Sequence, residues 1–468
     1  MLAKKIKFNV FKLRYFFLFF LFFKCTVYSQ RVATRFNFSI FSCDNGFVNA
    51  IGSNGSGQLG IGVNSNQNSL VQPLLNGNFT AVAAGNGHSL FLKNDGTVWS
   101  VGANYHGQLG NGTTVSSYIP NQVLLMTNVV SIAANSHYSI FLKNDGTVWG
   151  VGDNNGGIFG DGTSVNKTIP IQIVGLSEII EISAGLGHIL FLKSDGSVWA
   201  IGGNYYGQIG NQPLFGVDTP TQITGLDNII QVSAGGTHSL FLKNDNTVWA
   251  TGSNNYGQIG NSVNVGTYNY SPFKIMELSG IVKISAGYLH SLFLQNNGIV
   301  KAAGYNNSGQ LGIGNNIDTN NPSSVLNILN ISDIYAGSSH SVFVKNDGTI
   351  FNVGSNGSGQ LGNGTNINTN IAVSLNGGCS VNLQTTDNDL DKNIEVFPNP
   401  IIDELSINLT KENLNGVASL YNCNGILVES ILLTNLKNVL RTNFLSSGIY
   451  ILKITLNKVT IEKKIIKS

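Results

Sequence analysis

The chain has little charge and few of the residues that usually mark a reactive site. Only 11% of its 468 residues are charged, the formal net charge is +2, and there are 9 prolines, 4 cysteines, 3 methionines and 7 histidines. The weak charge balance argues against a nucleic-acid partner, because nucleic-acid binding needs a clustered basic face. Hydrophobic residues make up 42% of the chain, so we expect a buried core rather than global disorder.

Sequence signatures of catalysis and metal binding are missing too. There is no P-loop lysine motif, no HExxH, no GxSxG and no EF-hand spacing, and the acidic residues are scattered. GSGQLG, at 55–60 and 357–362, formally matches GxGxxG, but no helix follows to bind phosphate at its N-terminus. We therefore predict no enzyme activity, no cofactor and no metal. Calcium held by the Asn- and Asp-rich loops is left as an alternative.

The first 29 residues have the pattern of a secretion signal. Basic residues from Lys4 to Arg14 precede nine apolar residues, YFFLFFLFF at 15–23. A spanning helix needs about 20 apolar residues, so no stable transmembrane segment is predicted. We expect a signal peptide over 1–29, cleaved after Ser29, and a secreted or outer-surface protein. An uncleaved anchor or a lipid on Cys25 is the alternative.

One phrase recurs along most of the chain. HSLFLKNDGTVW at 88–99 returns as HYSIFLKNDGTVW, HILFLKSDGSVW and HSLFLKNDNTVW, and a first copy has Phe38 in place of histidine. Each copy is followed by a phrase such as GANYHGQLG. The period of about 50 residues is typical of a solenoid or propeller. Apolar alternation around Asn-Asp-Gly predicts an antiparallel hairpin with a primed turn, and no helical periodicity is present.

The ends of the array favour a closed ring of seven four-stranded blades. In this interpretation each blade begins with a PxxV-type strand, such as IPNQVLL at 119–125. The first copy lacks that strand, and the last copy runs into a surplus one, NTNIAVSL at 368–375. We expect the surplus strand to insert into the first sheet, which would remove both exposed edges. A disulfide between Cys43 and Cys379 would then latch the ring, which remains a hypothesis.

Residues that recur in every copy are interpreted as structural. A glycine after the hairpin and an asparagine two residues later suit a tight turn. The aligned histidines are distributed around a ring and cannot meet at one metal ion. The structural set is Gly102, Asn104, Gly107 and Gly110, with His88, His137, His188, His238, His290 and His340.

Residues that vary between constant flanks are the candidates for binding. A rigid scaffold with variable loops rich in Tyr, Asn, Ser and Gly is typical of recognition surfaces, although a merely solvated surface has the same polarity. The loop candidates are Tyr105, His106, Tyr205, Tyr206 and Tyr256. The four tryptophans share one column and either form a partly exposed arc or, as we favour, pack between blades: Trp99, Trp149, Trp199 and Trp249.

The composition changes near residue 381. LQTTDNDLDKN at 383–393 reads as a polar linker, and the alternating pattern over 394–468 predicts a small antiparallel β-sandwich. The expected fold class is all-β, a seven-bladed β-propeller followed by this small sandwich. The expected boundaries are 1–29 for the signal peptide, 30–380 for the propeller, 381–393 for the linker and 394–468 for the C-terminal domain.

Both folded parts resemble known families. The pattern aGxxHSLFLKNDGTVWxxGxNxxGQLG, over about residues 31–380, resembles the regulator of chromosome condensation repeat, which implies a seven-bladed propeller. VFPNP at 396–400, LSSGIYILKI at 445–454 and KKIIK at 463–467 resemble a type IX secretion sorting domain of type A. That resemblance implies contact with the secretion machinery through residues 394–468 and removal of the domain after export.

We expect a monomeric secreted or cell-surface propeller that binds an extracellular protein or glycan. The rivals are an enzyme acting on polysaccharide and an inhibitor of a secreted enzyme, which is a special case of binding. Nucleotide exchange on a GTPase, the activity of the family's founding member, is not expected. An exported protein meets no cytosolic GTPase, and a shared fold does not carry function.

Overall fold

The computed structural model describes most of the two folded parts. It covers residues 31–376 except 44–45, 211–214 and 263–265, and residues 394–467 except 399–400, 402, 410–415, 423–426, 446–447 and 457–458. The predicted signal peptide and linker, and the cysteines Cys25, Cys379 and Cys423, lie outside the described residues. Apart from one 3-10 turn, η1 (Asn155–Gly157), every described element is a β-strand. The all-β prediction is confirmed.

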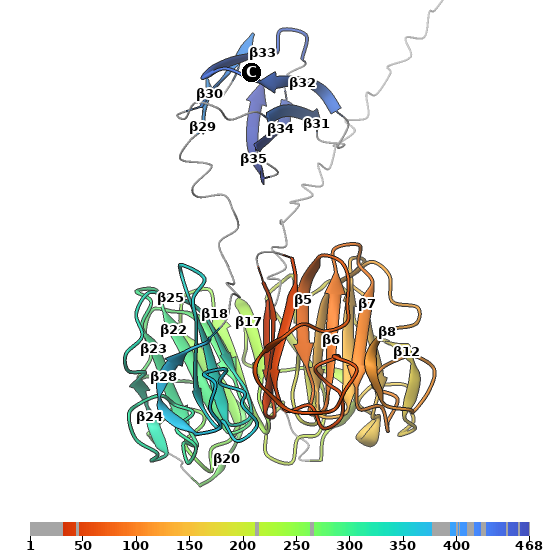
Figure 1. Cartoon of the computed structure of the whole chain (residues 1–468), viewed down its shortest axis with the longest axis vertical. Helices are drawn as coiled ribbons and strands as arrows, with labels where there is room; N and C mark the ends of the chain where they lie inside the picture. Colours follow the sequence, from red (N-terminus) through yellow and green to blue (C-terminus); the bar gives the residue numbers. More distant parts are fainter. Residues whose placement is uncertain are drawn as a thin grey trace, which may run out of the picture.

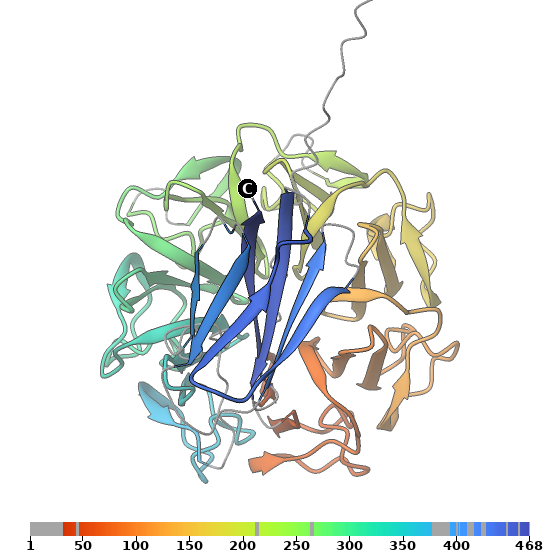
Figure 2. The same ribbon diagram turned by 90° about the horizontal axis from the view of Figure 1, so that it is seen from above.

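Residues 32–374 form seven antiparallel sheets of four strands, and the strands of each sheet pair in chain order. Figure 2 shows these sheets arranged as the blades of a ring. Blades one to four comprise β1 (Val32–Arg35), β2 (Phe38–Ser42), β3 (Val48–Gly52), β4 (Gln67–Val71); β5 (Phe79–Ala84), β6 (His88–Lys93), β7 (Val98–Gly102), β8 (Ser117–Gln122); β9 (Val129–Asn135), β10 (Tyr138–Lys143), β11 (Val148–Gly152), β12 (Lys167–Ile173); β13 (Ile179–Ala184), β14 (His188–Lys193), β15 (Val198–Gly202), β16 (Val217–Gln222). Blades five to seven comprise β17 (Ile229–Ala234), β18 (His238–Lys243), β19 (Val248–Ser253), β20 (Tyr268–Lys274); β21 (Ile281–Ala286), β22 (His290–Gln295), β23 (Val300–Gly304), β24 (Thr319–Ser324); β25 (Ile331–Ala336), β26 (His340–Lys345), β27 (Ile350–Gly354), β28 (Thr369–Ser374).

The antiparallel order gives the ring two different faces. The first strand of every blade lines a central cavity. One face carries the connections between first and second strands and between third and fourth strands, and we call it the GQLG face after the phrase in the longer connection. The opposite face carries the hairpin turns and the crossings from blade to blade, and we call it the turn face. Figure 1 shows the blades from the side.

The hairpin turn differs from the predicted primed turn. A primed type I turn needs positive φ at two successive residues, but in the second blade only Gly96 has it, at 77°. The Gly96 N–H donates to the Lys93 carbonyl at 3.0 Å, and the Asp95 carboxylate accepts the Thr97 N–H at 2.9 Å. The aspartate thus bonds forward to the next strand. The glycine alone takes the left-handed conformation, which Asn246 also adopts with φ 64°.

The predicted strand exchange at the ring closure is wrong. β28 pairs with β27 in the last blade, and β4 completes the first blade. The PxxV-type strand therefore ends its blade instead of beginning it, so the predicted blade boundaries were one strand out of phase. A repeated sequence defines the length of a period but not its starting point, and strand pairing decides that point.

The ring nevertheless closes, through side-chain packing. Val342 and Val344 of the last blade share a buried cluster with Val32 and Phe41 of the first. The Gln360 amide donates to Asn37 Oδ1 at 3.2 Å across the same boundary. The two terminal blades lie side by side in Figure 2. The ring edges are thus covered without a shared strand.

The C-terminal residues form a separate small β domain, as predicted. β29 (Ile394–Phe397), β30 (Glu404–Leu409) and β33 (Lys437–Arg441) make one antiparallel sheet. The second contains β31 (Gly416–Asn422), β32 (Leu427–Leu433), β34 (Gly448–Leu456) and β35 (Val459–Lys467). Leu405 from the first sheet and Leu420 and Leu452 from the second belong to one core, which is the packing of a β-sandwich.

Cys43 lies in the closure cluster together with Leu375. It is buried, with 3% of its surface exposed, and it is disulfide-bonded. The partner lies outside the described residues, where Cys379 also lies, so the pair Cys43–Cys379 stays a prediction.

Peptide mapping without reduction is expected to find Cys43 joined to Cys379. A crosslink that closes a long loop restricts the unfolded chain, so Cys43→Ala should lower the free energy of unfolding by about 2–4 kcal/mol. Urea unfolding measures this loss, and Cys379→Ala should reproduce it. Cys423→Ala is the control and should change nothing. A map that joins Cys43 to Cys423 would contradict the prediction.

Candidate binding face and histidine network

Five histidines bond neighbouring blades together. Each begins the second strand of its blade, is fully buried, and places Nε2 2.9–3.0 Å from a serine Oγ in the next blade. The pairs are His88–Ser139, His188–Ser239, His238–Ser291, His290–Ser341 and His340–Ser39. The last pair crosses the ring closure, where Ser39 donates to Thr34 Oγ1 at 3.2 Å and Thr34 Oγ1 also contacts His340 Nε2.

The serine hydroxyl determines which imidazole nitrogen carries the proton. Ser139 donates its hydroxyl hydrogen to the Gln108 carbonyl at 2.8 Å, so the proton between His88 and Ser139 belongs to His88 Nε2. Gln108 is part of the GQLG phrase of the same blade as His88. The Nδ1 atom has no partner and lies against Gly85, where an added Cβ would stand 2.4 Å from it. A neutral imidazole is therefore built into the boundary.

Burial keeps these histidines neutral. It lowers the pKa of His88, His188, His238 and His290 to about 3 and that of His340 to about 4. A protonated ring would carry an N–H toward the glycine with no acceptor, and a buried charge without a partner is costly.

His137 does not belong to the histidine column, which corrects the sequence alignment. Tyr138 pairs with Gly152 in the register in which His88 pairs with Gly102. The third copy has one extra residue between histidine and phenylalanine, which the alignment overlooked. Tyr138 fills the buried position, and its hydroxyl donates to the Gly185 carbonyl at 2.6 Å. No serine is needed in the next blade, where Ile189 takes its place.

His137 instead stacks on His106 at the GQLG face. The ring centroids are 4.8 Å apart with an interplanar angle of 16°. Asn166 donates to His106 Nδ1 at 3.0 Å, and Asp153 Oδ1 lies 3.8 Å from the same nitrogen. Partial burial and then the neighbouring His106 lower the pKa of His137. His106 is therefore part of a local cluster rather than a solvated loop histidine.

The GQLG phrase holds the loops of this face in place. The Asn104 side chain is fully buried, accepts the Leu109 N–H at 2.9 Å and donates to the Thr113 carbonyl at 3.0 Å. Gly107 has φ 86° and packs on the outer strand of the next blade, where a Cβ would lie 2.6 Å from the Lys167 carbonyl. Gly102 and Gly110 also have positive φ. These contacts explain why the phrase recurs at every boundary.

Exposed aromatic side chains gather on the GQLG face over blades four to six. Tyr206 of blade four lies edge-on to Tyr268 of blade five, with centroids 5.1 Å apart. Tyr256 of blade five contacts Tyr305 of blade six at 5.0 Å. Tyr205 contacts Phe215, and these two are 60% and 76% exposed. We call this surface the tyrosine arc: Tyr205, Tyr206, Phe215, Tyr256, Tyr268, Tyr270 and Tyr305.

The structure separates the five predicted loop residues into two groups. Tyr205, Tyr206 and Tyr256 belong to the tyrosine arc. Tyr105, which is 75% exposed, and His106 lie on blade two. In blade three the two variable positions are Asn155 and Gly156, which lie in η1, so neither is aromatic. Phe215 and Tyr305 were missed because they lie outside the two variable positions, although a count of aromatics over the whole connection would have found them.

The four tryptophans lie near the turn face, at the other end of the blades. Each is partly buried and packs against a cluster between two blades. A lysine from the preceding strand covers each ring, at 4.7 Å for Lys93 over Trp99 and 4.4 Å for Lys143 over Trp149. Trp199 and Trp249 have the same arrangement with Lys193 and Lys243. They therefore lie apart from the tyrosine arc.

Comparison with known proteins agrees with this architecture. The family model described as RCC1-like domain matches residues 31–383, which include every blade. The chain belongs to the RCC1-like domain family. No curated protein matches the chain. This RCC1-like chain has 23% sequence identity to human WBSCR16, whose crystal structure it matches with a TM-score of 0.64. The match covers 70% of this chain and 94% of that one. The chain is 22% identical to Prp20p from Saccharomyces cerevisiae, with coverages of 78% and 88% and a TM-score of 0.64.

A second family model assigns the C-terminal part of the RCC1-like chain. The secretion system C-terminal sorting domain matches residues 395–468. The sorting domain directs export by the type IX system to the cell surface or the medium. Within the described ranges, no helix has the length and apolarity to cross a membrane. The same ranges contain no group of three histidine, cysteine or acidic side chains placed to hold a metal ion.

The stability of the protein is expected to fall as the pH drops below about 6.5. Unfolded histidines bind protons below that value, whereas the buried histidines of the network do so only near pH 3 to 4. Between these limits the unfolded state holds more protons. Each buried histidine therefore removes about 1.4 kcal/mol from the free energy of unfolding per pH unit. Denaturant unfolding at several pH values measures the slope.

His290→Gln isolates one histidine of the network. Glutamine retains an N–H donor for Ser341 and does not titrate, so the slope should become shallower by about 1.4 kcal/mol per pH unit. Ile284→Val, which removes buried apolar contact but no titratable group, is the matched control and should leave the slope unchanged. The same slope for His290→Gln and the wild-type protein would show that this histidine is not held neutral.

Proposed function

We propose that the protein is an exported binding module whose tyrosine arc binds an extracellular protein or glycan. The observation that carries the proposal is a set of contacts between exposed and half-buried aromatic side chains over three blades of a rigid ring. Tyrosine offers a large contact area at low conformational cost, and it dominates recognition surfaces for that reason.

The backbone beneath the tyrosine arc is fixed before any partner arrives. The Gln208 side chain accepts the Tyr206 N–H at 3.0 Å, and Gln258 accepts the Tyr256 N–H at 2.9 Å. The Tyr270 hydroxyl donates to the Tyr205 carbonyl at 3.3 Å and so joins the loops of blades four and five. Fixed loops reduce the entropy lost on binding, which favours affinity.

Both partner classes suit the chemistry of the arc. Aromatic faces supply apolar area, and the surrounding hydroxyl and amide groups supply hydrogen bonds for either a protein or a sugar. Inhibition of a secreted enzyme would be one form of protein binding. Binding is proposed rather than catalysis because the arc is the most exposed aromatic feature of the face and contains neither an acid–base pair nor a nucleophile with a base.

Affinity capture with the full chain, from secreted proteins and from surface glycans, is expected to return one specific partner. Replacing Tyr205, Phe215 and Tyr256 together by serine should then weaken that complex by at least about tenfold, because buried aromatic anchors carry most binding energy. Biolayer interferometry measures the change. The substitutions are on exposed side chains, so the melting temperature should stay within a few degrees.

The matched control is Phe47→Ser with Met276→Ser. These side chains are also exposed, at 53% and 75%, but lie on the turn face, and their loss should leave the affinity unchanged. Tyr105→Ser with His106→Ser tests whether blade two takes part. If the control weakens binding as much as the arc variant does, the arc is not the site. Turnover of a surface polysaccharide by the purified chain would replace this proposal with the enzyme alternative.

A further inference from the structure

One blade places a cation where five of the other six have glycine and blade three has Asn135. In blade one, Arg35 pairs with Phe38 in the register in which Gly85 bonds His88. Gly185, Gly235, Gly287 and Gly337 hold the same position in blades four to seven, and each glycine faces its own histidine. In blade one both members of the pair differ, since phenylalanine replaces histidine and arginine replaces glycine. Arg35 is therefore the one guanidinium at this position among the seven blades.

The Arg35 side chain is buried, and two of its three nitrogens have no hydrogen-bond partner. It is 5% exposed, and its Nε and Nη2 atoms have no hydrogen-bond partner. Burial lowers its pKa to about 10, and the hydroxyl groups of Tyr138 and Tyr288 oppose that shift only in part. Even so, the guanidinium is charged at neutral pH. Asp333, a buried carboxylate of the inner strands, is already paired with Lys283 at 2.5 Å.

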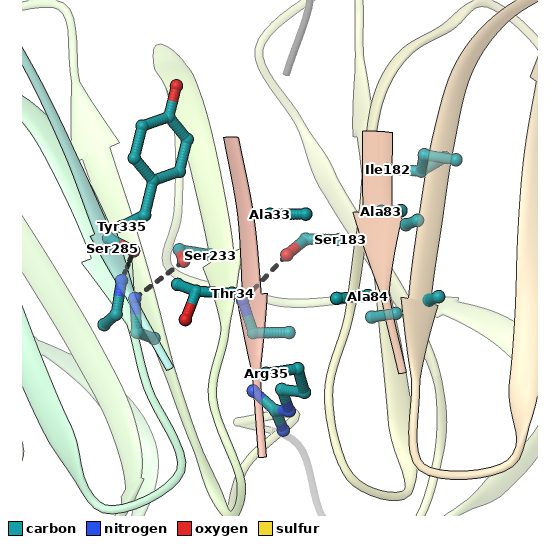
Figure 3. A pocket seen from close by; sticks show the side chains of 16 residues that line it. Ala33, Thr34, Arg35, Ala83, Ala84, Ile182, Ser183, Ser233, Ser285 and Tyr335 are labelled. Atoms are coloured by element: carbon teal, nitrogen blue, oxygen red, sulfur yellow. Dashed lines mark hydrogen bonds between the residues drawn. The ribbon is translucent and has the colours of Figure 1, made fainter. Parts of the chain in front are cut away.

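Arg35 lines the central cavity, whose volume is about 120 Å³. Figure 3 shows Arg35 together with serines from the inner strands of blades four to six around this space. Ser183, Ser233 and Ser285 each accept a backbone N–H from the next blade at 2.9 Å. A hydroxyl that accepts in this way still has its own hydrogen to donate. The other lining residues are mostly alanines, which leave the space open.

We propose that the central cavity binds a small oxyanion, a phosphate, sulfate or carboxylate, through Arg35 and these serine hydroxyls. A buried guanidinium without a counter-ion is unfavourable, and planar bidentate recognition of oxyanions is the chemistry that arginine performs best. The cavity has room for an ion of this size, and the serines supply neutral donors for its remaining oxygens. This site is independent of the tyrosine arc and of any partner bound there.

Titration of inorganic phosphate into the full chain, followed by calorimetry and by ³¹P NMR line width, tests the site. We expect saturable binding of one phosphate per chain and a raised melting temperature relative to chloride at equal ionic strength. Arg35→Met should weaken binding by at least about tenfold, and Arg35→Lys should retain part of it. Competition by sulfate or acetate distinguishes a tetrahedral from a planar oxyanion.

Two further variants keep the test decisive. Replacing Ser183, Ser233 and Ser285 by alanine copies Ala33, Ala83 and Ala133 of the other blades, so it should preserve the fold and weaken binding. Lys93→Met removes a cation on the turn face and should change nothing. The proposal is overturned if none of the three anions binds the wild-type chain saturably at millimolar concentration. Unchanged affinity in a folded Arg35→Met variant also overturns it.

Discussion

The whole propeller depends on how one blade is bonded to the next. A sheet of four short strands cannot bury both faces alone, so each blade is stable only against its neighbours. Four of the seven boundaries combine apolar packing with a buried hydrogen-bond chain of histidine, serine and a GQLG carbonyl. Because this chain of hydrogen bonds ends on a GQLG carbonyl, it also fixes the loops of the GQLG face. The loops proposed to bind a partner are therefore supported by the same contacts that hold the ring together.

Departures from the repeat occur as matched sets. Tyr138 replaces histidine and reaches the next blade by itself, and the following blade has Ile189 in place of the bonding serine. Phe38 replaces histidine in the first blade, and Arg35 replaces the glycine beside it. Such pairs follow from close packing, because a change in one side chain alters the space and the hydrogen bonds of its neighbour. A propeller of similar blades thereby acquires one site that differs from the rest.

Export and the proposed recognition belong to different folded parts of the chain. The sorting domain carries the secretion signal, and the propeller is left to present its faces outside the cell. The two aromatic groups of the propeller have different roles in the structure. The tryptophans are covered by lysines near the turn face, whereas the tyrosines of the arc are exposed and contact one another across blade boundaries.

The sequence by itself determined the all-β class, the seven repeats, the hairpins and the sorting domain, because strand alternation and turn residues are local signals. It also pointed to Tyr205, Tyr206 and Tyr256. Only the tertiary structure decided that β28 stays in the last blade and that Tyr138, not His137, fills the buried column. It also decided that Nε and Nη2 of Arg35 are buried without a hydrogen-bond partner. Those outcomes depend on register and on contacts between residues hundreds of positions apart, which a repeating pattern does not encode.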